Sequence, residues 1–269
     1  MRAIALHPDV LVVTSALLQV NCVIVRGGVE GTEGGETFVI DSPVLPDELD
    51  ALPALLEQAQ FPTPSGLLVT HGDWDHLLGR LAFPGVALGC AESTAERLRA
   101  TPGEAQRELR AFDEDLLIER ARPLALGAVQ ALPVPGRCAV GDRDLELHPT
   151  DGHTPDGMAV MVPWASVLVV GDYLSTAELP TLGDGGDLSA YLATLERLRG
   201  LIVRSEHVVV GHGPILDPGR ALGVLEEDVA YLRGLTSSGG EVELPASRRG
   251  AAQRRAHEAN VRRCAARTS

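Results

Sequence analysis

Four side chains that can bind a metal ion follow directly on an apolar segment, residues 67–69. They lie within six residues: His71, Asp73, Asp75 and His76. A continuous apolar run is typical of a strand buried on both faces, and Gly72 permits the tight turn that lets several side chains converge. Two imidazoles and two carboxylates suit a divalent cation of borderline or hard character. The segment therefore predicts a strand that delivers metal ligands at its carboxyl end.

The same order of residue types recurs three times downstream. Each time an apolar or turn-forming segment leads to a glycine beside one ligand-type residue, and these residues are His153, Asp172 and His212. Acidic residues and histidines often cluster in solvated loops, so the first motif alone is a moderate signal. Four strand ends that each offer a ligand predict one shared metal site.

Composition narrows the class of function. The chain has 269 residues, of which 45% are hydrophobic, enough for one large α/β domain or two small ones. A net charge of −14 and 3% aromatic residues argue against a nucleic-acid partner, which needs a basic stripe or a stacking surface. All 23 basic residues are Arg, which excludes a Lys Schiff base. The four cysteines are scattered without a C-x-x-C pair, so neither a disulfide framework nor a zinc ribbon is expected.

Hydropathy gives no reason to expect a membrane partner. No apolar run approaches the ~18 residues that span a bilayer, and the first residues do not form a leader pattern. We therefore expect a cytoplasmic protein with a small-molecule substrate, acting alone or as a homodimer.

Periodicity and turn residues predict the elements that position these ligands. Besides the strands that end at His71 and His212, strands are expected at residues 10–14, 22–26, 37–40, 86–89, 139–148 and 159–170. Helices are expected at residues 46–60, 94–100 with Ser93 as N-cap, 103–121, 187–201, 218–235 and 251–267. Residues 27–35 read as a hairpin connection. We expect residues 1–236 to form one domain, and residues 237–269 a linker and a C-terminal helix packed on it.

These motifs, in this order, resemble the metallo-β-lactamase-fold hydrolases, and among them the glyoxalase II-like branch. The resemblance extends from about residue 20 to residue 214. It rests on Asn21 before an early strand, on residues 40–43 and on the four ligand segments. It implies an α/β (α+β) fold, a four-layer αββα sandwich with the metal site at one edge of two sheets.

The resemblance also implies two metal ions, with zinc expected first. Its ligand sets are His71, Asp73 and His153 for one ion, Asp75, His76 and His212 for the other, and Asp172 as the bridge. Two cations lower the pKa of a bridging water, and the resulting hydroxide attacks a carbonyl carbon or a phosphorus. Asp75 would orient that hydroxide and carry its proton. Asp41 would lie beneath the site and hold one ligand in place.

Two positions depart from the family pattern. The family usually has His where this chain has Asp73, and the flavodiiron branch has Glu. A carboxylate there should shift metal preference toward iron or manganese. If Asp73 binds weakly, a single ion would remain on Asp75, His76, Asp172 and His212. The second departure is Asp156, which we expect at the mouth of the substrate pocket.

Several neighbours of the ligands leave two interpretations open. Tyr173 could donate a hydrogen bond to an oxyanion, or lie at the pocket edge without a catalytic part. Trp74 is expected to pack the ligand loop rather than line the substrate site. The helix at residues 103–121 is expected on the surface, with a lid over the metals as the alternative. Four histidines without the glycine-flanked strand end are interpreted as non-ligands: His7, His148, His207 and His257.

The expected activity is hydrolysis of a small ester, thioester or lactone at a dinuclear metal site. A di-iron oxidoreductase is the first alternative, suggested by Asp73, although the sequence shows no FMN-binding phosphate loop. A phosphodiesterase would use the same metals but fits poorly with the acidic composition. A non-catalytic sensing module would be expected to lose ligands, whereas all seven positions carry ligand-competent side chains.

Overall fold

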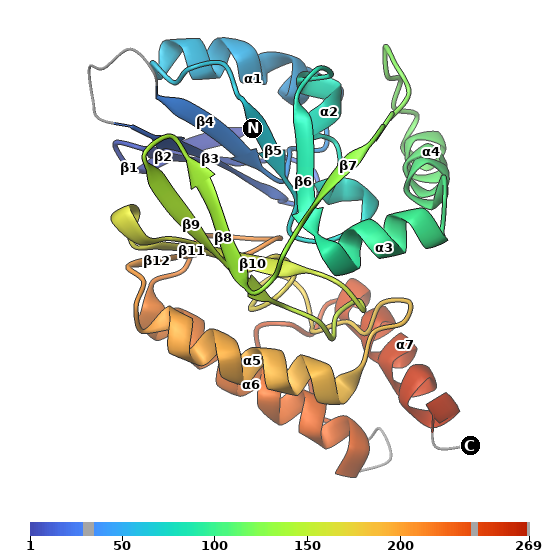
Figure 1. Ribbon diagram of the computed structural model, residues 1–269. Helices are drawn as coiled ribbons and strands as arrows, with labels where there is room; N and C mark the ends of the chain where they lie inside the picture. The colour runs from blue at the N-terminus through green and yellow to red at the C-terminus, as the bar shows by residue number, and fades with distance from the viewer. Residues whose placement is uncertain (29–34, 238–241, 268–269) are drawn as a thin grey trace.

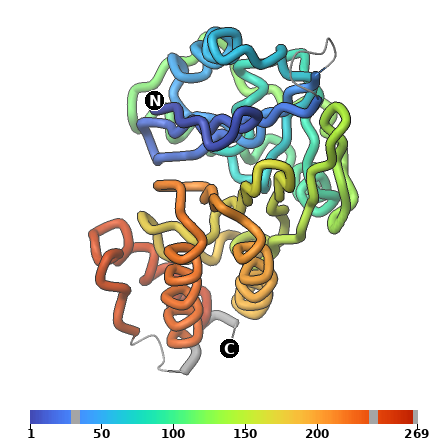
Figure 2. Tube along the Cα trace, turned by 90° about the vertical axis from the view of Figure 1, so that its left-hand side faces the viewer, coloured from blue at the N-terminus to red at the C-terminus, as the bar shows by residue number. Residues whose placement is uncertain are grey.

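Two β-sheets lie face to face between two layers of helices (Figures 1 and 2). The computed structural model describes residues 1–28, 35–237 and 242–267. One sheet has the strand order β1-β2-β3-β4-β5-β6-β7, and the other has the order β12-β11-β10-β9-β8. This arrangement confirms the α/β, four-layer αββα sandwich expected from the sequence.

The first sheet changes direction halfway across. Its strands are β1 (Arg2–His7), β2 (Val10–Thr14), β3 (Asn21–Gly27), β4 (Glu36–Ile40), β5 (Gly66–Leu68), β6 (Ala87–Ala91) and β7 (Val129–Leu132). Strands β1 to β4 pair antiparallel, and β4 to β7 pair parallel. Its outer helices are α1 (Pro46–Gln58), α2 (Gly79–Ala82), α3 (Glu92–Ala100) and α4 (Glu104–Leu116). Parallel strands end at the same sheet edge, so β4 and β5 bring Asp41 and the ligand loop together.

The second sheet supplies the remaining ligands. Its strands are β8 (Gly136–Val140), β9 (Arg143–Pro149), β10 (Met158–Val162), β11 (Val167–Val169) and β12 (His207–Val209). Only β11 and β12 pair parallel, so both end toward the ligands that follow them, Asp172 and His212. The helices on its outer side are α5 (Leu188–Ile202), α6 (Pro218–Ser237) and α7 (Ala251–Arg267) (Figure 1).

The hydrophobic core explains why the central strands are apolar without alternation. In β2 and β3, Val12 and Val25 face the other sheet, while Val13 and Ile24 face the helices, and all four are buried. Strands buried on both faces need no polar face. Helix α1 begins with Pro46 and two acidic residues in its first turn, which suits a helix N-terminus.

Three predicted elements differ in the structure because of local backbone geometry. Residues 139–148 form parts of two strands, β8 and β9, joined by a turn with Gly141 at φ +60°. Residues 159–170 are interrupted by a 3-10 turn at Pro163–Ala165 and by Ser166, which has positive φ. Helix α4 ends at Leu116, because Leu117 adopts a left-handed conformation.

Other differences concern short elements. Helix α3 has Ala91 as its N-cap, so Ser93 lies inside the helix and the prediction that it caps the helix was wrong. Strands β1 and β7 were not predicted; their exposed or half-buried residues give no continuous apolar run. The predicted connection between β3 and β4 and the predicted linker fall mainly on residues 29–34 and 238–241, outside the described residues.

The C-terminal segment is tied to the loop between β11 and α5. Arg248 is buried, and its guanidinium donates to Asp228 at 2.6 Å and to the Ser175 carbonyl at 3.1 Å. On α7, Asn260 donates to the Pro180 carbonyl at 2.7 Å and accepts from the Leu182 amide at 3.0 Å. This segment therefore fixes the backbone of a loop that borders the metal ligands.

Across the described residues, none of the helices combines the length and apolar character needed to cross a bilayer.

Candidate metal centre

The first ligand loop is organised by Asp41, at the end of β4. Asp41 has φ +57°, and its carboxylate accepts from the Thr70 amide and the Thr70 hydroxyl, both at 2.8 Å. Its Oδ2 also lies 2.9 Å from Nδ1 of His76. Asp41 thus joins the end of β5 to a metal ligand, beneath the site, as the resemblance implied.

His71, Asp73 and His153 form the first ligand group. Nε2 of His71 and Nε2 of His153 each lie 3.5 Å from Asp73 Oδ2. The same nitrogen atoms lie 3.7 Å and 3.5 Å from Asp172 Oδ2. Four ligand atoms from three loops therefore surround one position.

Asp75, His76 and His212 form the second group. His212 Nε2 lies 3.3 Å from Asp75 Oδ2, and His76 Nε2 lies 4.0 Å from the same oxygen. Both imidazoles face Asp172 Oδ1, at 3.2 Å from His76 and 3.3 Å from His212. All seven side chains predicted as ligands are thus brought together in two adjacent groups.

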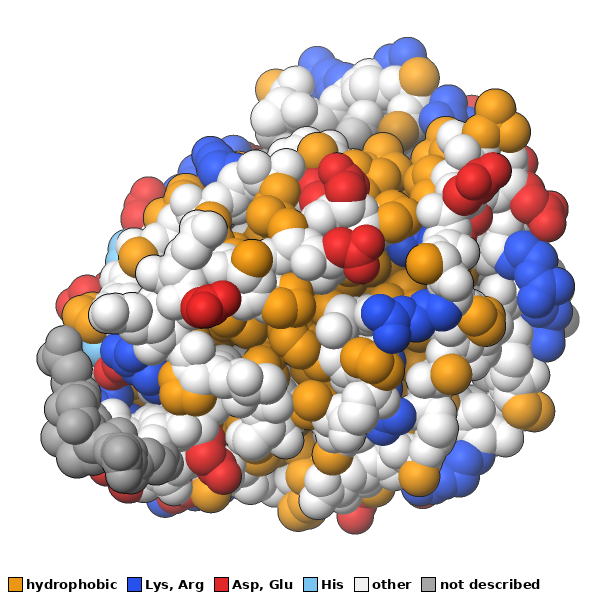
Figure 3. Space-filling model, turned by 90° about the horizontal axis from the view of Figure 1, so that it is seen from above, with side chains coloured by type: hydrophobic (Ala, Val, Ile, Leu, Met, Phe, Trp, Pro, Cys, Tyr) orange, Lys and Arg blue, Asp and Glu red, His pale blue; other side chains and the backbone are white. Residues whose placement is uncertain are grey.

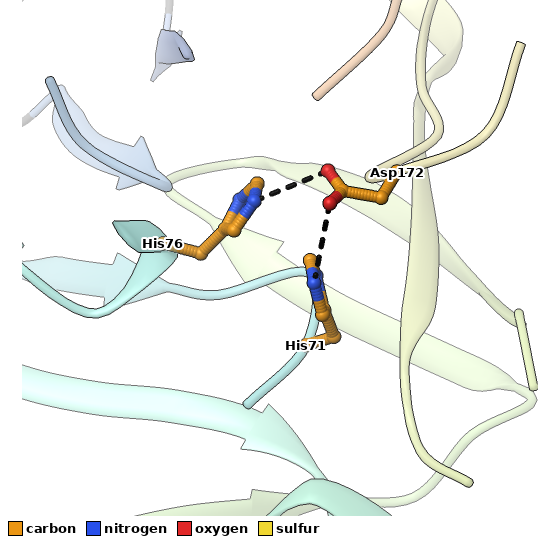
Figure 4. Close-up of side chains that lie close together, drawn as sticks. All are labelled: His71, His76 and Asp172. Carbon is orange, nitrogen blue, oxygen red and sulfur yellow. Dashed lines mark ion pairs between the residues drawn. The ribbon is translucent and has the colours of Figure 1, made fainter. Parts of the chain in front are cut away.

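Asp172 divides its two oxygens between the groups. Figure 4 shows Oδ1 directed at His76 and Oδ2 at His71, from a carboxylate that stands between the two rings. The close approach requires a glycine at position 211, because a Cβ there would lie 2.0 Å from Asp172 Oδ1. Asp172 therefore presents one carboxylate oxygen to each of the two groups of metal-competent side chains.

The side chains fit a pair of divalent cations. Ligand atoms about 2.0–2.1 Å from a tetrahedral zinc ion lie roughly 3.3–3.4 Å apart, and the separations around Asp172 range from 3.2 to 3.7 Å. Nε2 of His71, His76 and His153 is buried without a hydrogen-bond partner within the described chain. Such polar atoms are costly to bury unless a ligand satisfies them.

The opposite ring nitrogens are held by the protein. Nδ1 of His153 lies 2.8 Å from the Thr181 carbonyl, and Nδ1 of His212 lies 2.9 Å from the Leu18 carbonyl. With His76 held by Asp41, three imidazoles have Nδ1 engaged as donor and Nε2 left to face the site. Such contacts orient metal-binding histidines and fix their tautomer.

Carboxylates shift the proton affinities of these ligands. Burial disfavours a charged imidazole, but Asp73 and Asp172 outweigh it and raise the pKa of His153 to about 9. Burial also disfavours charge on His76 and His212, yet neighbouring carboxylates raise both pKa values well above the ordinary value. These carboxylates are Asp41, Asp172 and Asp75 for His76, and Asp172, Asp75 and Glu178 for His212. Burial likewise disfavours the carboxylate of Asp172, yet the neighbouring imidazoles hold its pKa well below the usual range.

Metal uptake near neutral pH is therefore expected to release protons. His76, His153 and His212 are protonated in the metal-free protein below their raised pKa values, and an imidazole must lose that proton before it binds a cation. We expect protons to be released when metal binds, and an apparent metal affinity that falls as the pH falls. Titration calorimetry in buffers of different ionisation enthalpy measures the number released.

The matched variants are His153→Gln, expected to release fewer protons, and His148→Gln, expected to match the wild type. A binding heat that does not depend on the buffer would contradict the expectation.

Arg97 was not predicted. From α3 its guanidinium reaches Asp73 Oδ1 at 2.7 Å and Asp156 Oδ1 at 2.9 Å. Asp156 is buried and also accepts from the Gly72 amide at 2.9 Å, so it lies beneath the ligand loop rather than at a pocket mouth. Asp73 thus presents one oxygen to Arg97 and the other to the first ligand group. A positive charge at this point compensates for the carboxylate that replaces a histidine.

Tyr173 lies beneath the site. It is buried, and its hydroxyl donates to the Thr150 carbonyl and accepts from the His153 amide, both at 3.1 Å. The hydroxyl proton is therefore engaged by the backbone rather than offered to an oxyanion. This geometry supports a role in holding the loop that carries His153.

Tyr173→Phe is accordingly expected to reduce stability rather than to act on a chemical step. Loss of the hydroxyl leaves two backbone groups unpaired, which should lower the free energy of unfolding by about 1–3 kcal/mol. Urea denaturation of the metal-free protein measures this change. Tyr191→Phe is the control, because its hydroxyl makes a single longer bond, 3.3 Å, to the Asp172 carbonyl. Unchanged stability with a large fall in kcat would restore the oxyanion role.

Aromatic packing supports the interpretation of Trp74. Its ring lies 4.5 Å from that of Phe112, between the ligand loop and α4. The four histidines interpreted as non-ligands belong to none of the metal-competent groups found among the described residues. His257, for example, lies 3.1 Å from the Tyr231 hydroxyl, on the outer side of the second sheet.

Solved structures share this fold. A metallo-beta-lactamase family protein from Thermus thermophilus aligns with a TM-score of 0.67 and 20% identity, over 97% of this chain and 96% of that one. The sec-alkylsulfatase Pisa1 from Pseudomonas sp. aligns with a TM-score of 0.72 and 16% identity, over 97% of this chain and 49% of that one. The protein TTHA1623, solved in a di-iron-bound form, aligns with a TM-score of 0.57 and 25% identity, over 78% and 96%.

A search of curated proteins finds no match. The family model described as the metallo-beta-lactamase superfamily matches residues 16–212, a span that contains every ligand of the two groups. Its members are metallo-hydrolases, mostly enzymes, and the fold implies divalent metal ions. With the two sheets, the ligand order and this match in agreement, the chain belongs to the metallo-beta-lactamase superfamily.

Proposed function

We propose that the protein is a metal-dependent hydrolase that cleaves a small ester, thioester or lactone at a dinuclear site. The observation that carries the proposal is the position of Asp172, whose two oxygens face separate groups of three ligands. Within the superfamily this arrangement supports two cations that act on one substrate. Zinc is the first expectation, and the glyoxalase II-like branch remains our proposal for the nearest chemistry.

The two groups of ligands, with Asp172, would hold the divalent cations, which would supply a bound water of lowered pKa and polarise the substrate carbonyl. The water oxygen bonds to the carbonyl carbon, the bond from that carbon to sulfur or oxygen breaks, and the leaving group takes up a proton. Asp75 is the residue we assign to orient the water and carry its proton. It is buried, and although burial favours the protonated acid, His76 and His212 keep its pKa below the ordinary value. Asp75 is therefore ionised near neutral pH, and its carboxylate can accept a hydrogen bond from the water and orient it.

The test combines metal content with a substrate panel. Purified protein is analysed by plasma mass spectrometry and assayed against thioesters and lactones, with Asp75→Asn as the matched variant. Two equivalents of metal, turnover on either panel and a large loss of kcat in the variant are expected. Full metal content without turnover of any ester, thioester or lactone would count against the hydrolase.

A di-iron oxidoreductase is the second candidate, and one observation favours it. Asp73 gives the first group a carboxylate that is held by Arg97 and directed at His71 and His153. Hard oxygen ligands suit iron and manganese, and TTHA1623 was solved with two iron ions at 25% identity. Two equivalents of iron, oxygen uptake with an added reductant and no hydrolysis would favour this candidate.

A phosphodiester substrate has weaker support. The chain carries a net charge of −14, and on the face in Figure 3 the basic side chains lie among acidic ones instead of forming a stripe. Substrates that track many phosphates need a basic surface.

A further inference from the structure

A pocket of about 300 Å³ lies beside two segments that hold metal-competent histidines. Its walls come from the first loop of the chain at Leu18, from residues 177–181 and from α7 at Ala252 and Ala256. Two of these walls are the segments whose carbonyls hold Nδ1 of His212 and Nδ1 of His153. Two segments of the pocket wall therefore also hold the imidazole rings of His212 and His153 in place.

Glu178 is the one charged residue among the described residues that line the pocket. The apolar part of the lining is Leu18, Leu179 and three alanines, and the neutral polar part is Gln19, Thr181 and Gln253. The Glu178 side chain is 46% exposed, and its nearest charged neighbour is His212 Nδ1 at 4.0 Å. That nitrogen already donates to the Leu18 carbonyl at 2.9 Å. The Glu178 carboxylate thus has no hydrogen-bond partner within residues 1–28, 35–237 and 242–267.

The backbone that carries Glu178 is rigid. Its amide donates to Ser175 Oγ at 3.0 Å, and its carbonyl accepts from the buried Arg248 at 3.1 Å. Gln253 on α7 donates to the Ala177 carbonyl at 2.5 Å. The C-terminal segment therefore both forms a wall of the pocket and holds the backbone from which the Glu178 side chain extends.

The electrostatic surroundings favour a positive ligand. Six carboxylates belong to the metal centre and its border: Asp41, Asp73, Asp75, Asp156, Asp172 and Glu178. A single guanidinium, that of Arg97, pairs with two of these, Asp73 and Asp156. Even with two divalent cations bound, negative charge remains in excess by about one. An anionic group in this pocket would face Glu178, and no arginine is among the described residues that line the pocket.

We propose that this pocket takes a short aliphatic part of the substrate that ends in an ammonium group, and that Glu178 binds the ammonium. The bond that reacts in this substrate is taken from the proposed function. Binding of the ammonium group to Glu178 does not depend on that function. Small-molecule sites typically measure about 300–1,000 Å³, so the pocket suits a single unbranched chain. Leucine and alanine side chains provide contact with an aliphatic chain, and the few polar groups and the one carboxylate orient such a ligand.

Binding to the metal-free protein tests the proposal without any catalytic step. The probes are 6-aminohexanamide, hexanamide and adipamic acid, which share a chain and differ in charge, with dissociation constants measured by ligand-observed NMR. We expect the ammonium probe to bind about tenfold more tightly than the neutral one, and the carboxylate probe most weakly. Glu178→Gln should remove the preference, and Glu178→Arg should reverse it.

Glu108→Gln is the matched control. This exposed carboxylate on α4 contributes to the field around Asp73 but does not line the pocket. Glu108→Gln lowers the overall negative charge by the same amount as Glu178→Gln, and it should leave the preference for the ammonium probe in place. Equal affinity of the wild type for the three probes, or a preference that survives Glu178→Gln, would overturn the proposal.

Thioesters with the same three chain ends separate this inference from the proposed function. Ammonium preference in binding, without turnover of any ester, would support the pocket and count against the hydrolase. Turnover of neutral and cationic thioesters at equal kcat/KM, with equal binding of the three probes, would support the hydrolase and overturn the pocket. Each result addresses one proposal by itself.

Discussion

Asp172→Asn is expected to reduce hydrolytic activity by more than about 100-fold and to lower the metal content below two equivalents. Removal of a residue that merely supports a ligand typically costs about 10–100-fold in affinity or activity, and Asp172 contacts both ligand groups directly. The amide would face one group with an oxygen and the other with an NH2 donor. A donor directed at a cation position opposes binding there, so we expect one ion to be lost first.

Metal analysis and thioester turnover on the same preparation measure both effects. Asp142→Asn is the control, because this exposed carboxylate makes only a 3.9 Å contact with Arg143. The variant should keep wild-type metal content and activity. Retention of two tightly bound ions by Asp172→Asn would contradict the bridging assignment.

The clustering of the metal-competent side chains could be predicted because several of them occupy positions with a local signature. His71, Asp172 and His212 all follow an apolar strand within a few residues and adjoin a glycine. Strand ends that meet at one sheet edge place such residues together whatever the details of packing. The four layers could be predicted for a related reason, since strands buried on both faces require helices on the outside of each sheet.

The groups that hold the ligands have no comparable signature. Thr181 and Leu18 contribute backbone carbonyls, and a carbonyl is the same for every residue type. Arg97 lies on a helix, and its distance from Asp73 depends on how α3 packs against the sheet. The direction of the Tyr173 hydroxyl depends on the Thr150 carbonyl in another loop. Such contacts arise from tertiary packing, which no local pattern encodes.

Strands with few buried apolar residues, β1 and β7, could not be predicted from the sequence either. Strand β7 contributes Val129–Leu132 with two exposed residues, and β1 is exposed along much of its length. Both lie at edges of the first sheet, where a strand can remain partly in solvent. Their position follows from pairing with β6 and β2 rather than from burial, so periodicity does not reveal them.

Arg97→Gln is expected to lower the free energy of unfolding of the metal-free protein by about 3–5 kcal/mol, because it breaks a largely buried ion pair. Asp156 has 1% of its side chain exposed and would be left without a cationic partner. Asp73 would lose the contact that turns one of its oxygens away from the metal ligands. Denaturation in urea measures the loss, with Arg99→Gln, an exposed arginine on the same helix, as the control.

Asp73→His, which restores the usual residue of the family, should not by itself create a better first site. The new imidazole would lie against the Arg97 guanidinium, which has no acceptor to offer it and repels its protonated form. We expect the double variant Asp73→His with Arg97→Gln to bind metal more tightly than the single Asp73→His variant. A thermodynamic cycle of metal affinity and stability tests this coupling. If the single effects add within about 0.3–0.5 kcal/mol, the two positions are independent and charge compensation by Arg97 is refuted. If they couple, the carboxylate and the guanidinium act as one unit in place of the family's histidine.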